Sequence, residues 1–337
     1  MNEIKPLLTI AIPVYNTEKY LTRCLESLVN IQQAEKLDIV LINDGSPDHS
    51  DEIASNFARL YPHCLRYIRK DNGGWGSSIN LAIEKAVGKY FKILDSDDYY
   101  QSKELDDFLS FLASQDSDLV LTSMTEIHSN GQKHFPIPEE RDKRVLPLEN
   151  HLEGMQHNYP LGMTTYRTAL LQENKIRVSD RYYADLEFNL KPLAYTCTVA
   201  YRSCNLYQYD KTREEASTST RSYAIHRANF LQVVQGLAQH YAAQLARAPQ
   251  RLCKLYKREL ITLAQFGYNL YLSPTYAFSD IPVHMEELRR FDAELFNLVP
   301  DIARDIYKSK KKGIPYILIW KRLGINILNF RKLWTSF

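Results

Sequence analysis

The chain has 337 residues and 45% of them are hydrophobic, which is enough for one large or two ordinary domains with a sizeable core. The 42 basic and 40 acidic residues nearly balance, so the composition gives no sign of a nucleic-acid partner. Five scattered cysteines without a Cys-x-x-Cys pair argue against a disulfide framework and a zinc site. Residues 1–6 lack a signal-peptide layout, and no apolar run approaches the roughly 20 residues of a membrane-spanning helix, so we expect a cytoplasmic protein.

Strand and helix patterns alternate through the first part of the chain. Nearly continuous apolar runs predict strands that are covered on both faces, and apolar stripes of helical period separate them. The predicted strands are residues 7–14, 37–42, 65–68, 90–94 and 118–123. This alternation predicts an α/β fold with a mostly parallel, doubly wound sheet and helices on both faces.

A polar cluster follows each of the first four predicted strands. The clusters are Tyr15-Asn16, Asn43-Asp44, Asn72-Gly73-Gly74 and Asp95–Asp98. Each alone is an ordinary turn sequence, but the carboxyl ends of parallel strands meet at one edge of a sheet, where ligands bind. The last cluster holds three carboxylates within four residues, which suits either a hard divalent ion that also holds phosphate or a solvated acidic turn.

Four motifs in this order resemble those of the family 2 glycosyltransferases of the bacterial cell-surface glycan type. They are Pro13-Val14-Tyr15-Asn16, Asn43-Asp44-Gly45-Ser46, Asn72–Asn80 and Asp95-Ser96-Asp97-Asp98, the last with a D-x-D pattern. The resemblance implies a GT-A fold and a nucleotide-sugar donor, most commonly a UDP-sugar. It also implies a divalent ion such as Mn²⁺ or Mg²⁺ and inversion at the anomeric carbon.

The resemblance further implies roles for individual residues of these motifs. Tyr15 would stack on the base of the donor, and Asp44 would hydrogen-bond the base or the ribose. Asp97 would be the main metal ligand, with Asp95 beside it on the metal or the ribose, whereas Asp98 would either join them or support the loop. The remaining donor-binding candidates are Pro13, Asn72, Gly73 and Ser96.

The segment Arg181–Phe188 leads into a short predicted helix and resembles the part of the family that carries the catalytic base. Many members have Glu-Asp there and this chain has Ala184-Asp185, so the resemblance assigns the base to Asp185. A carboxylate can accept the proton of an attacking hydroxyl, and a helix N-terminus would keep it ionised at neutral pH. A plain helix cap is the alternative role, and Glu187 is the second candidate for the base.

A loop follows two further strand-like runs, residues 196–201 and 205–209. It resembles a family loop that closes over the diphosphate, and Arg213 and Ser217 are the candidates there, because arginine binds phosphate oxygens bidentately. Glu214-Glu215 departs from the family pattern, so a solvated loop is an equal alternative.

The pattern becomes helical from Tyr223 onward, with stripes separated by prolines. We therefore expect a nucleotide-sugar-binding catalytic domain at residues 1–220 and a helical region at 221–337, for which packing on the catalytic domain, an acceptor site and a homo-oligomer interface are open roles. Residues 307–337 hold eight basic residues and no acidic one. This tail predicts either an amphipathic helix on an anionic membrane surface or a buried helix with a solvated basic face.

These features predict an inverting, metal-dependent glycosyltransferase that acts on a glycan, lipid-linked or glycoprotein acceptor in the cytoplasm or peripherally at the inner face of the cell membrane. One alternative is a nucleotidylyltransferase, which would carry a basic glycine-rich loop where this chain has Tyr15-Asn16-Thr17. A second alternative is a GT-A-fold binding module without catalysis, because Ala184 replaces a common acidic residue.

Overall fold

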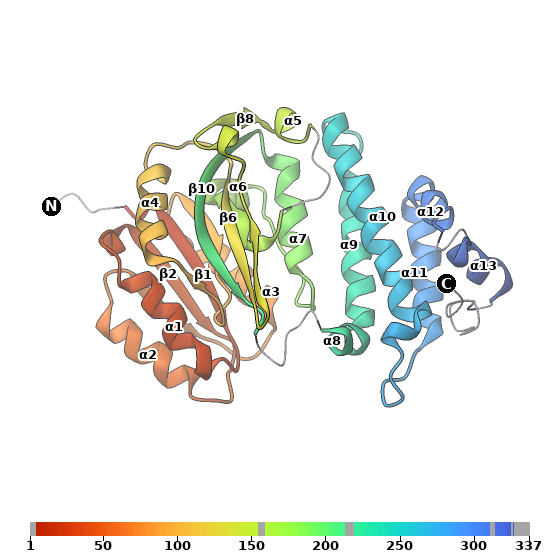
Figure 1. Cartoon of the computed structure of the whole chain (residues 1–337), viewed down its shortest axis with the longest axis horizontal. Helices are drawn as coiled ribbons and strands as arrows, with labels where there is room; N and C mark the ends of the chain where they lie inside the picture. Colours follow the sequence, from red (N-terminus) through yellow and green to blue (C-terminus); the bar gives the residue numbers. More distant parts are fainter. Residues whose placement is uncertain (1–4, 154–158, 213–218, 311–313, 325, 327–337) are drawn as a thin grey trace. The chain divides into compact units, whose positions relative to one another are not determined.

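The computed structural model describes residues 5–153, 159–212, 219–310, 314–324 and 326 (Figure 1). The chain divides into two compact units. The α/β unit comprises residues 1–180 and 184–213, and the helical unit comprises residues 181–183 and 214–337. Within the described ranges, no helix is both long and apolar enough to cross a bilayer.

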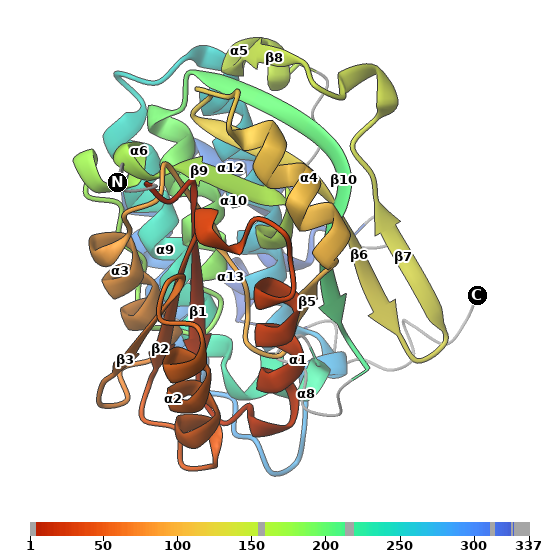
Figure 2. The same cartoon turned by 90° about the vertical axis from the view of Figure 1, so that its left-hand side faces the viewer.

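A single ten-stranded sheet with strand order β3-β2-β1-β4-β9-β6-β10-β5 forms the centre of the α/β unit (Figure 2). The strands on this path are β3 Leu65–Arg69, β2 Leu37–Asn43, β1 Leu8–Val14, β4 Tyr90–Ile93, β9 Thr164–Arg167, β6 Leu119–His128, β10 Thr198–Asp210 and β5 Tyr99–Tyr100. Two further strands, β7 Gly131–Phe135 and β8 Val145–Pro147, pair with β6 and β10. Every residue of β1, β2 and β4 is buried, as the continuous apolar runs predict for strands covered on both faces.

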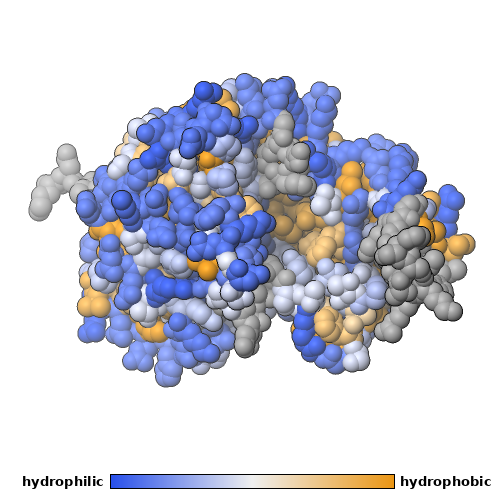
Figure 3. All heavy atoms as spheres, viewed as in Figure 1, coloured by the Kyte–Doolittle hydropathy of each residue, from blue (hydrophilic) through white to orange (hydrophobic). Residues whose placement is uncertain are grey.

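Helices cover the two faces of this sheet (Figure 2). On one face α1 Glu18–Val29 contacts α2 Ser50–Leu60 and α4 Ser102–Leu112. On the other, α3 Trp75–Lys85 packs on β1 and β2 and contacts α6 Thr168–Glu173. The predicted mostly parallel sheet with helices on both faces is confirmed. In the view of Figure 3 the surface of this unit is mostly hydrophilic, consistent with an apolar interior.

The sheet differs from the predicted pattern in two places. The strand-like runs at residues 196–201 and 205–209 belong to one 13-residue strand, β10, whose register shifts after Arg202 let it continue alongside β6. In addition, β9 is inserted between β4 and β6 and runs antiparallel to both. Neither feature leaves a local pattern, because both depend on pairing with residues far away in the chain.

The helical unit contains six helices within the described part of the chain. They are α8 Thr220–Ile225, α9 Arg227–Gln244, α10 Gln250–Leu272, α11 Met285–Leu298, α12 Pro300–Tyr307 and α13 Tyr316–Leu323. Pro249 lies directly before α10 and Pro300 is the first residue of α12, positions where a missing amide N–H costs nothing. Leu245, directly after α9, is exposed.

The first part of the basic tail is packed into this unit. Helix α13 buries Tyr316, Ile317 and Trp320. Lys321 forms an ion pair of 2.6 Å with the buried carboxylate of Asp292, which also accepts a 2.8 Å hydrogen bond from the Tyr307 hydroxyl. Residues 316–323 therefore form a buried helix, which is the second of the two predicted roles. Residues 327–337 lie outside the described part.

We expect Gly76→Ala to destabilise the protein, because a Cβ at this position would lie 2.0 Å from the carbonyl oxygen of Ser179. Overpacking against backbone costs about 1–3 kcal/mol or more, since no side chain can move aside. The measurement is the free energy of unfolding in urea. Glu84→Ala on the exposed face of the same helix is the control and should change it by less than about 0.5 kcal/mol. Equal effects of the two changes would contradict the close approach.

Candidate active site

The ends of four parallel strands meet at one edge of the sheet. Strands β1, β2, β3 and β4 are adjacent and parallel, so their carboxyl ends lie on the same side. The loops after β1, β2 and β3 begin with Tyr15, Asp44 and Lys70. After β4, Leu94 comes first and Asp95 follows it. The predicted convergence of the polar clusters is thus present.

The loop after β1 presents an aromatic ring. Tyr15 is 52% exposed, so its ring face is open to a ligand. The next residue, Asn16, has φ +55 and its amide N–H donates a 3.3 Å hydrogen bond to Ser46 Oγ. Pro13 is buried inside β1 opposite Ile42, so it shapes the strand end from within the sheet.

Asp44 holds the loop after β3 in place. Its carboxylate is 3% exposed and accepts hydrogen bonds from the amides of Gly73, at 2.9 Å, and Gly74, at 2.8 Å. It also forms an ion pair with Lys70, and its carbonyl oxygen accepts a 3.0 Å bond from the Asn72 side chain. Gly74 has φ +86, which favours glycine. The structure therefore gives Asp44 a supporting task in addition to the predicted contact with a base or ribose.

The three carboxylates of residues 95–98 point to different partners. Asp98 is 1% exposed and accepts hydrogen bonds from the Tyr207 hydroxyl, at 2.6 Å, and from the Asp210 amide, at 2.9 Å. Burial, together with the charge of Asp95, raises the pKa of Asp98 well above its usual range. Asp98 therefore ties the turn to β10, which is the supporting role left open by the sequence.

Asp95 and Asp97 remain at the edge and are half-buried. Asp95 Oδ1 accepts a 2.9 Å hydrogen bond from the indole N–H of Trp75, which fixes the direction of this carboxylate. The carbonyl oxygen of Asp97 accepts a 3.1 Å bond from Arg23. Ser96 is buried, and its hydroxyl accepts a 3.0 Å bond from Thr17, so Ser96 joins the turn to the start of α1.

A second carboxylate group lies near this turn. Asp185 is the first residue of α7 Asp185–Leu190 and is half-buried. Burial, and secondly the negative charge of Asp95, raise the pKa of Asp185 to about 6. This influence shows that the fold brings Asp185 close to the acidic turn although they are far apart in the sequence. The predicted ionised state at neutral pH is compatible with a pKa of about 6, because the acid is then mostly deprotonated at pH 7.

Glu187, the second candidate for the base, is occupied. It is 3% exposed, accepts a 2.5 Å hydrogen bond from the Ser179 amide and pairs with Lys191 at 3.0 Å. Both carboxylate oxygens of Glu187 are thus bound to other residues of the α/β unit. Of the two acidic residues of α7, Asp185 is therefore the one that stays a candidate for the base.

The acidic turn offers few protein ligands for a metal ion. Within the described ranges no group of three or more His, Cys, Asp or Glu residues could hold a metal ion. Asp95 and Asp97 fit a different pattern, in which one or two carboxylates hold Mg²⁺ or Mn²⁺ together with phosphate oxygens of a substrate. The residues present therefore fit a divalent ion that binds together with a phosphorylated ligand.

Residues 9–173 match the family model described as Glycosyl transferase family 2. The chain therefore carries a glycosyltransferase family 2 domain at residues 9–173. It is 29% identical over 212 residues to the uncharacterised glycosyltransferase EpsJ of Bacillus subtilis, covering 60% of this chain and 61% of EpsJ. It is 28% identical over 210 residues to the poly(ribitol-phosphate) beta-N-acetylglucosaminyltransferase TarS of Staphylococcus aureus, covering 61% of this chain and 36% of TarS. The chain thus spans less than two-thirds of the length of these relatives.

Solved structures show the same fold. The crystal structure of S. aureus TarS 1–349 in complex with UDP-GlcNAc has a TM-score of 0.65 at 22% identity, covering 94% of this chain and 87% of that chain. The mannosyltransferase PcManGT from Pyrobaculum calidifontis in complex with GDP-Man and Mn²⁺ has a TM-score of 0.52 at 17% identity, covering 90% and 81%. The predicted GT-A architecture is confirmed.

The sequence missed several residues that organise the site. Lys70, Trp75, Tyr207 and Arg23 all bind parts of the loops at the sheet edge. A signal was present for Trp75, because it lies inside one of the four motifs, and for Lys70, because it directly follows β3. The predicted Arg213 and Ser217 lie outside the described residues, so their role stays a prediction.

We expect Asp98→Ala to destabilise the protein by about 3 kcal/mol, because it leaves two buried donors without an acceptor. Asp98→Asn should cost less, since an amide oxygen can still accept one of the two bonds. Urea unfolding measures both. The matched control is Asp97→Ala in the same turn, which should change stability by less than about 1 kcal/mol because Asp97 is only half-buried. A similar loss for Asp97→Ala and Asp98→Ala would contradict the division of roles.

Proposed function

We propose that this chain is an inverting glycosyltransferase that moves a sugar from a UDP-sugar to a hydroxyl group of a bacterial cell-surface glycan. The observation that carries the proposal is the placement of two kinds of carboxylate at one sheet edge. Asp95 and Asp97 lie half-buried in the acidic turn, and Asp185 lies near enough for Asp95 to raise its pKa. A leaving diphosphate and an attacking hydroxyl need these two functions on opposite sides of the anomeric carbon.

The donor would bind across the loops after β1, β3 and β4. The exposed Tyr15 ring offers a flat surface for stacking on a base. The loop of Asn72 and Gly73, held by Asp44, forms the neighbouring wall. The crystal structures of S. aureus TarS with bound UDP and with bound UDP-GlcNAc support uridine as the base.

Asp97 and Asp95 would hold a Mn²⁺ or Mg²⁺ ion that neutralises the diphosphate and so makes it a better leaving group. The indole N–H of Trp75 fixes the direction of the Asp95 carboxylate. PcManGT was solved in complex with GDP-Man and Mn²⁺, which supports a divalent ion beside the diphosphate. This structural neighbour thereby favours the metal-assisted mechanism.

Asp185 would act as the general base. The acceptor oxygen forms a bond to the anomeric carbon, the bond from that carbon to the diphosphate oxygen breaks, and the hydroxyl proton moves to Asp185. A single displacement of this kind inverts the configuration. A pKa of about 6 suits the role, because the group is mostly ionised at pH 7 yet more basic than an ordinary aspartate.

The relatives point to a cell-surface polymer as the acceptor. TarS is a poly(ribitol-phosphate) beta-N-acetylglucosaminyltransferase, and a B. spizizenii relative is a poly(ribitol-phosphate) beta-glucosyltransferase. We propose a cytoplasmic enzyme that works on such a polymer or its lipid-linked precursor. A peripheral membrane contact would rest on residues 327–337, because α13 packs its apolar face within the helical unit.

We expect UDP-sugars to raise the thermal unfolding midpoint only when Mn²⁺ is present. A ligand at 100 times its Kd stabilises by about 2.7 kcal/mol, which corresponds to a rise of several degrees. Asp97→Ala should abolish the part of the rise that depends on Mn²⁺. Trp75→Phe, which removes the indole N–H donor but keeps an aromatic ring, should reduce that part. A screen of nucleotide-sugars by thermal shift measures this. If no nucleotide-sugar had an effect, the binding-module alternative would be favoured.

We expect Asp185→Asn to lower the rate of sugar transfer by at least about 100-fold, because general base catalysis contributes 100- to 10,000-fold. Binding of UDP with Mn²⁺, measured by calorimetry, should stay within about twofold because Asp185 acts on the acceptor. Transfer is followed as UDP release from UDP-GlcNAc with poly(ribitol-phosphate) as the test acceptor. Asp180→Asn, an exposed neighbour, is the control. Near-normal turnover by Asp185→Asn would rule out this residue as the base.

A further inference from the structure

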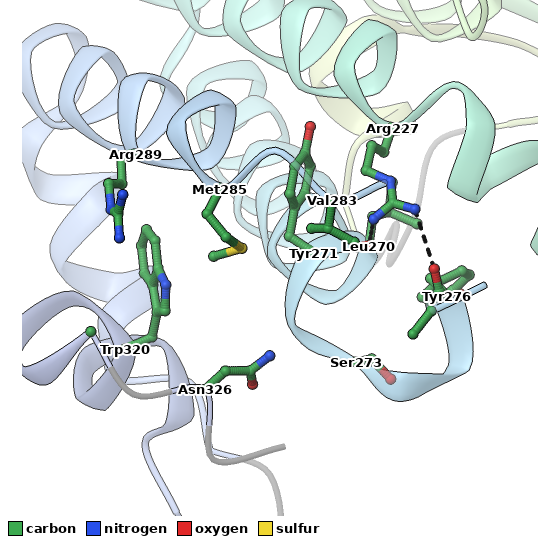
Figure 4. Close-up of a pocket in the computed structure, with 12 residues that line it drawn as sticks. Arg227, Leu270, Tyr271, Ser273, Tyr276, Val283, Met285, Arg289, Trp320 and Asn326 are labelled. Carbon is green, nitrogen blue, oxygen red and sulfur yellow. Dashed lines mark hydrogen bonds between the residues drawn. The ribbon is translucent and has the colours of Figure 1, made fainter. Parts of the chain in front are cut away.

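The helical unit contains a cavity of about 270 Å³ that the donor site does not use (Figure 4). Its wall includes Arg227 from α9, Tyr271 from α10, Arg289 from α11 and Trp320 from α13. Among the described residues, no aspartate or glutamate lines it. The cavity is therefore bounded by cationic and aromatic side chains.

Arg227 is a buried cation, and its hydrogen-bond partners within the described residues are neutral carbonyl oxygens. Its side chain is 3% exposed, and its guanidinium donates to the carbonyl oxygens of Ala224 at 2.7 Å, Leu270 at 3.4 Å and Tyr276 at 3.3 Å. In the described part of the chain no carboxylate forms an ion pair with Arg227. A buried charge without a counter-ion is costly, and burial accordingly lowers the pKa of Arg227.

Glu287, the carboxylate whose charge affects Arg227, is engaged elsewhere. It accepts a 2.5 Å hydrogen bond from the Tyr271 hydroxyl and affects Arg227 only through its charge. The Arg227 guanidinium carbon lies 5.5 Å from the centre of the Tyr271 ring. The positive charge at the cavity wall is therefore incompletely balanced by the protein.

A second arginine lines the opposite part of the cavity. Figure 4 shows Arg289 and Trp320 on the side away from Arg227 and Tyr276. Arg289 is exposed and no ion pair joins it to a carboxylate among the described residues. Trp320 is 5% exposed. Two arginines that lack carboxylate partners and a pair of aromatic rings thus surround one space.

We propose that this cavity binds the phosphate ester of a small polyol or sugar. Guanidinium groups bind phosphate oxygens in paired hydrogen bonds, and the aromatic faces pack against the C–H groups of a polyol. A volume of about 270 Å³ lies just below the usual range of ligand sites, about 300–1,000 Å³, so it fits one such unit rather than a nucleotide or an oligosaccharide. The proposal goes beyond sugar transfer, and it concerns residues of the helical unit alone.

Calorimetric titration of the full chain with sn-glycerol 3-phosphate tests it, with glycerol as the uncharged comparison. Saturable binding of the ester and none of glycerol is expected. Arg289→Gln should weaken the binding on the order of tenfold, because a hydrogen bond to a charged group contributes about 1.5–3 kcal/mol. Arg290→Gln removes the same charge one residue away, is exposed and lies outside the cavity lining, so it is the matched control.

A vesicle experiment separates a soluble ligand from a lipid headgroup of the same chemistry. If the unit binds the headgroup, the chain floats with phosphatidylglycerol vesicles and not with phosphatidylcholine vesicles, and Arg289→Gln reduces flotation more than Arg290→Gln. The proposal is overturned if neither the soluble ester nor the vesicles bind, or if the two variants weaken binding equally. Since neither measurement involves sugar transfer, this outcome is independent of the donor site.

Discussion

Repulsion among the carboxylates of residues 95–98 is the constraint on which the candidate site depends, and the fold relieves it by giving each group a different environment. Asp98 is turned inward to Tyr207 and the backbone of Asp210, and Asp95 is fixed by the N–H of Trp75. Asp97 remains at the edge. Because Asp98 is fastened to β10, the end of β4 is held beside a strand from the far part of the sheet. Asp95 and Asp97 stay half-buried at the sheet edge.

The same arrangement determines the environment of the candidate base. After β9 and α6 the chain runs back along α3, where the side chain of Asn80 exchanges hydrogen bonds of 2.8 and 3.0 Å with the backbone of Val178. Gly76 allows the backbone of Ser179 to approach the same helix. These contacts deliver α7 to the acidic turn, so that the charge of Asp95 reaches Asp185. The influence of the Asp95 charge on Asp185 thus depends on tertiary contacts between segments far apart in the sequence.

Residues 181–183, which end two residues before Asp185, belong to the helical unit. Tyr183 has φ +72, an uncommon value for a residue other than glycine, and its ring stacks on Tyr223 at 5.0 Å. Arg181 donates a 2.6 Å hydrogen bond to Gln232. The packing of aromatic rings within the helical unit therefore fixes the backbone at Tyr183, two residues before the candidate base Asp185. The chain thus passes from the helical unit at Tyr183 through Ala184 to Asp185.

The sequence by itself determined the local features: the buried strands, the polar clusters at their ends and the proline-separated helices. These follow from residue type and period over short windows. Only the tertiary structure decided that Asp98 supports the turn, that Glu187 is occupied by Ser179 and Lys191, and that α13 is buried. The partners of Asp98 are more than 100 residues away, with a separation of 109 for Tyr207. The three aspartates of residues 95–98 look alike in the sequence, and they acquire different environments only when strand pairing places different neighbours beside each of them.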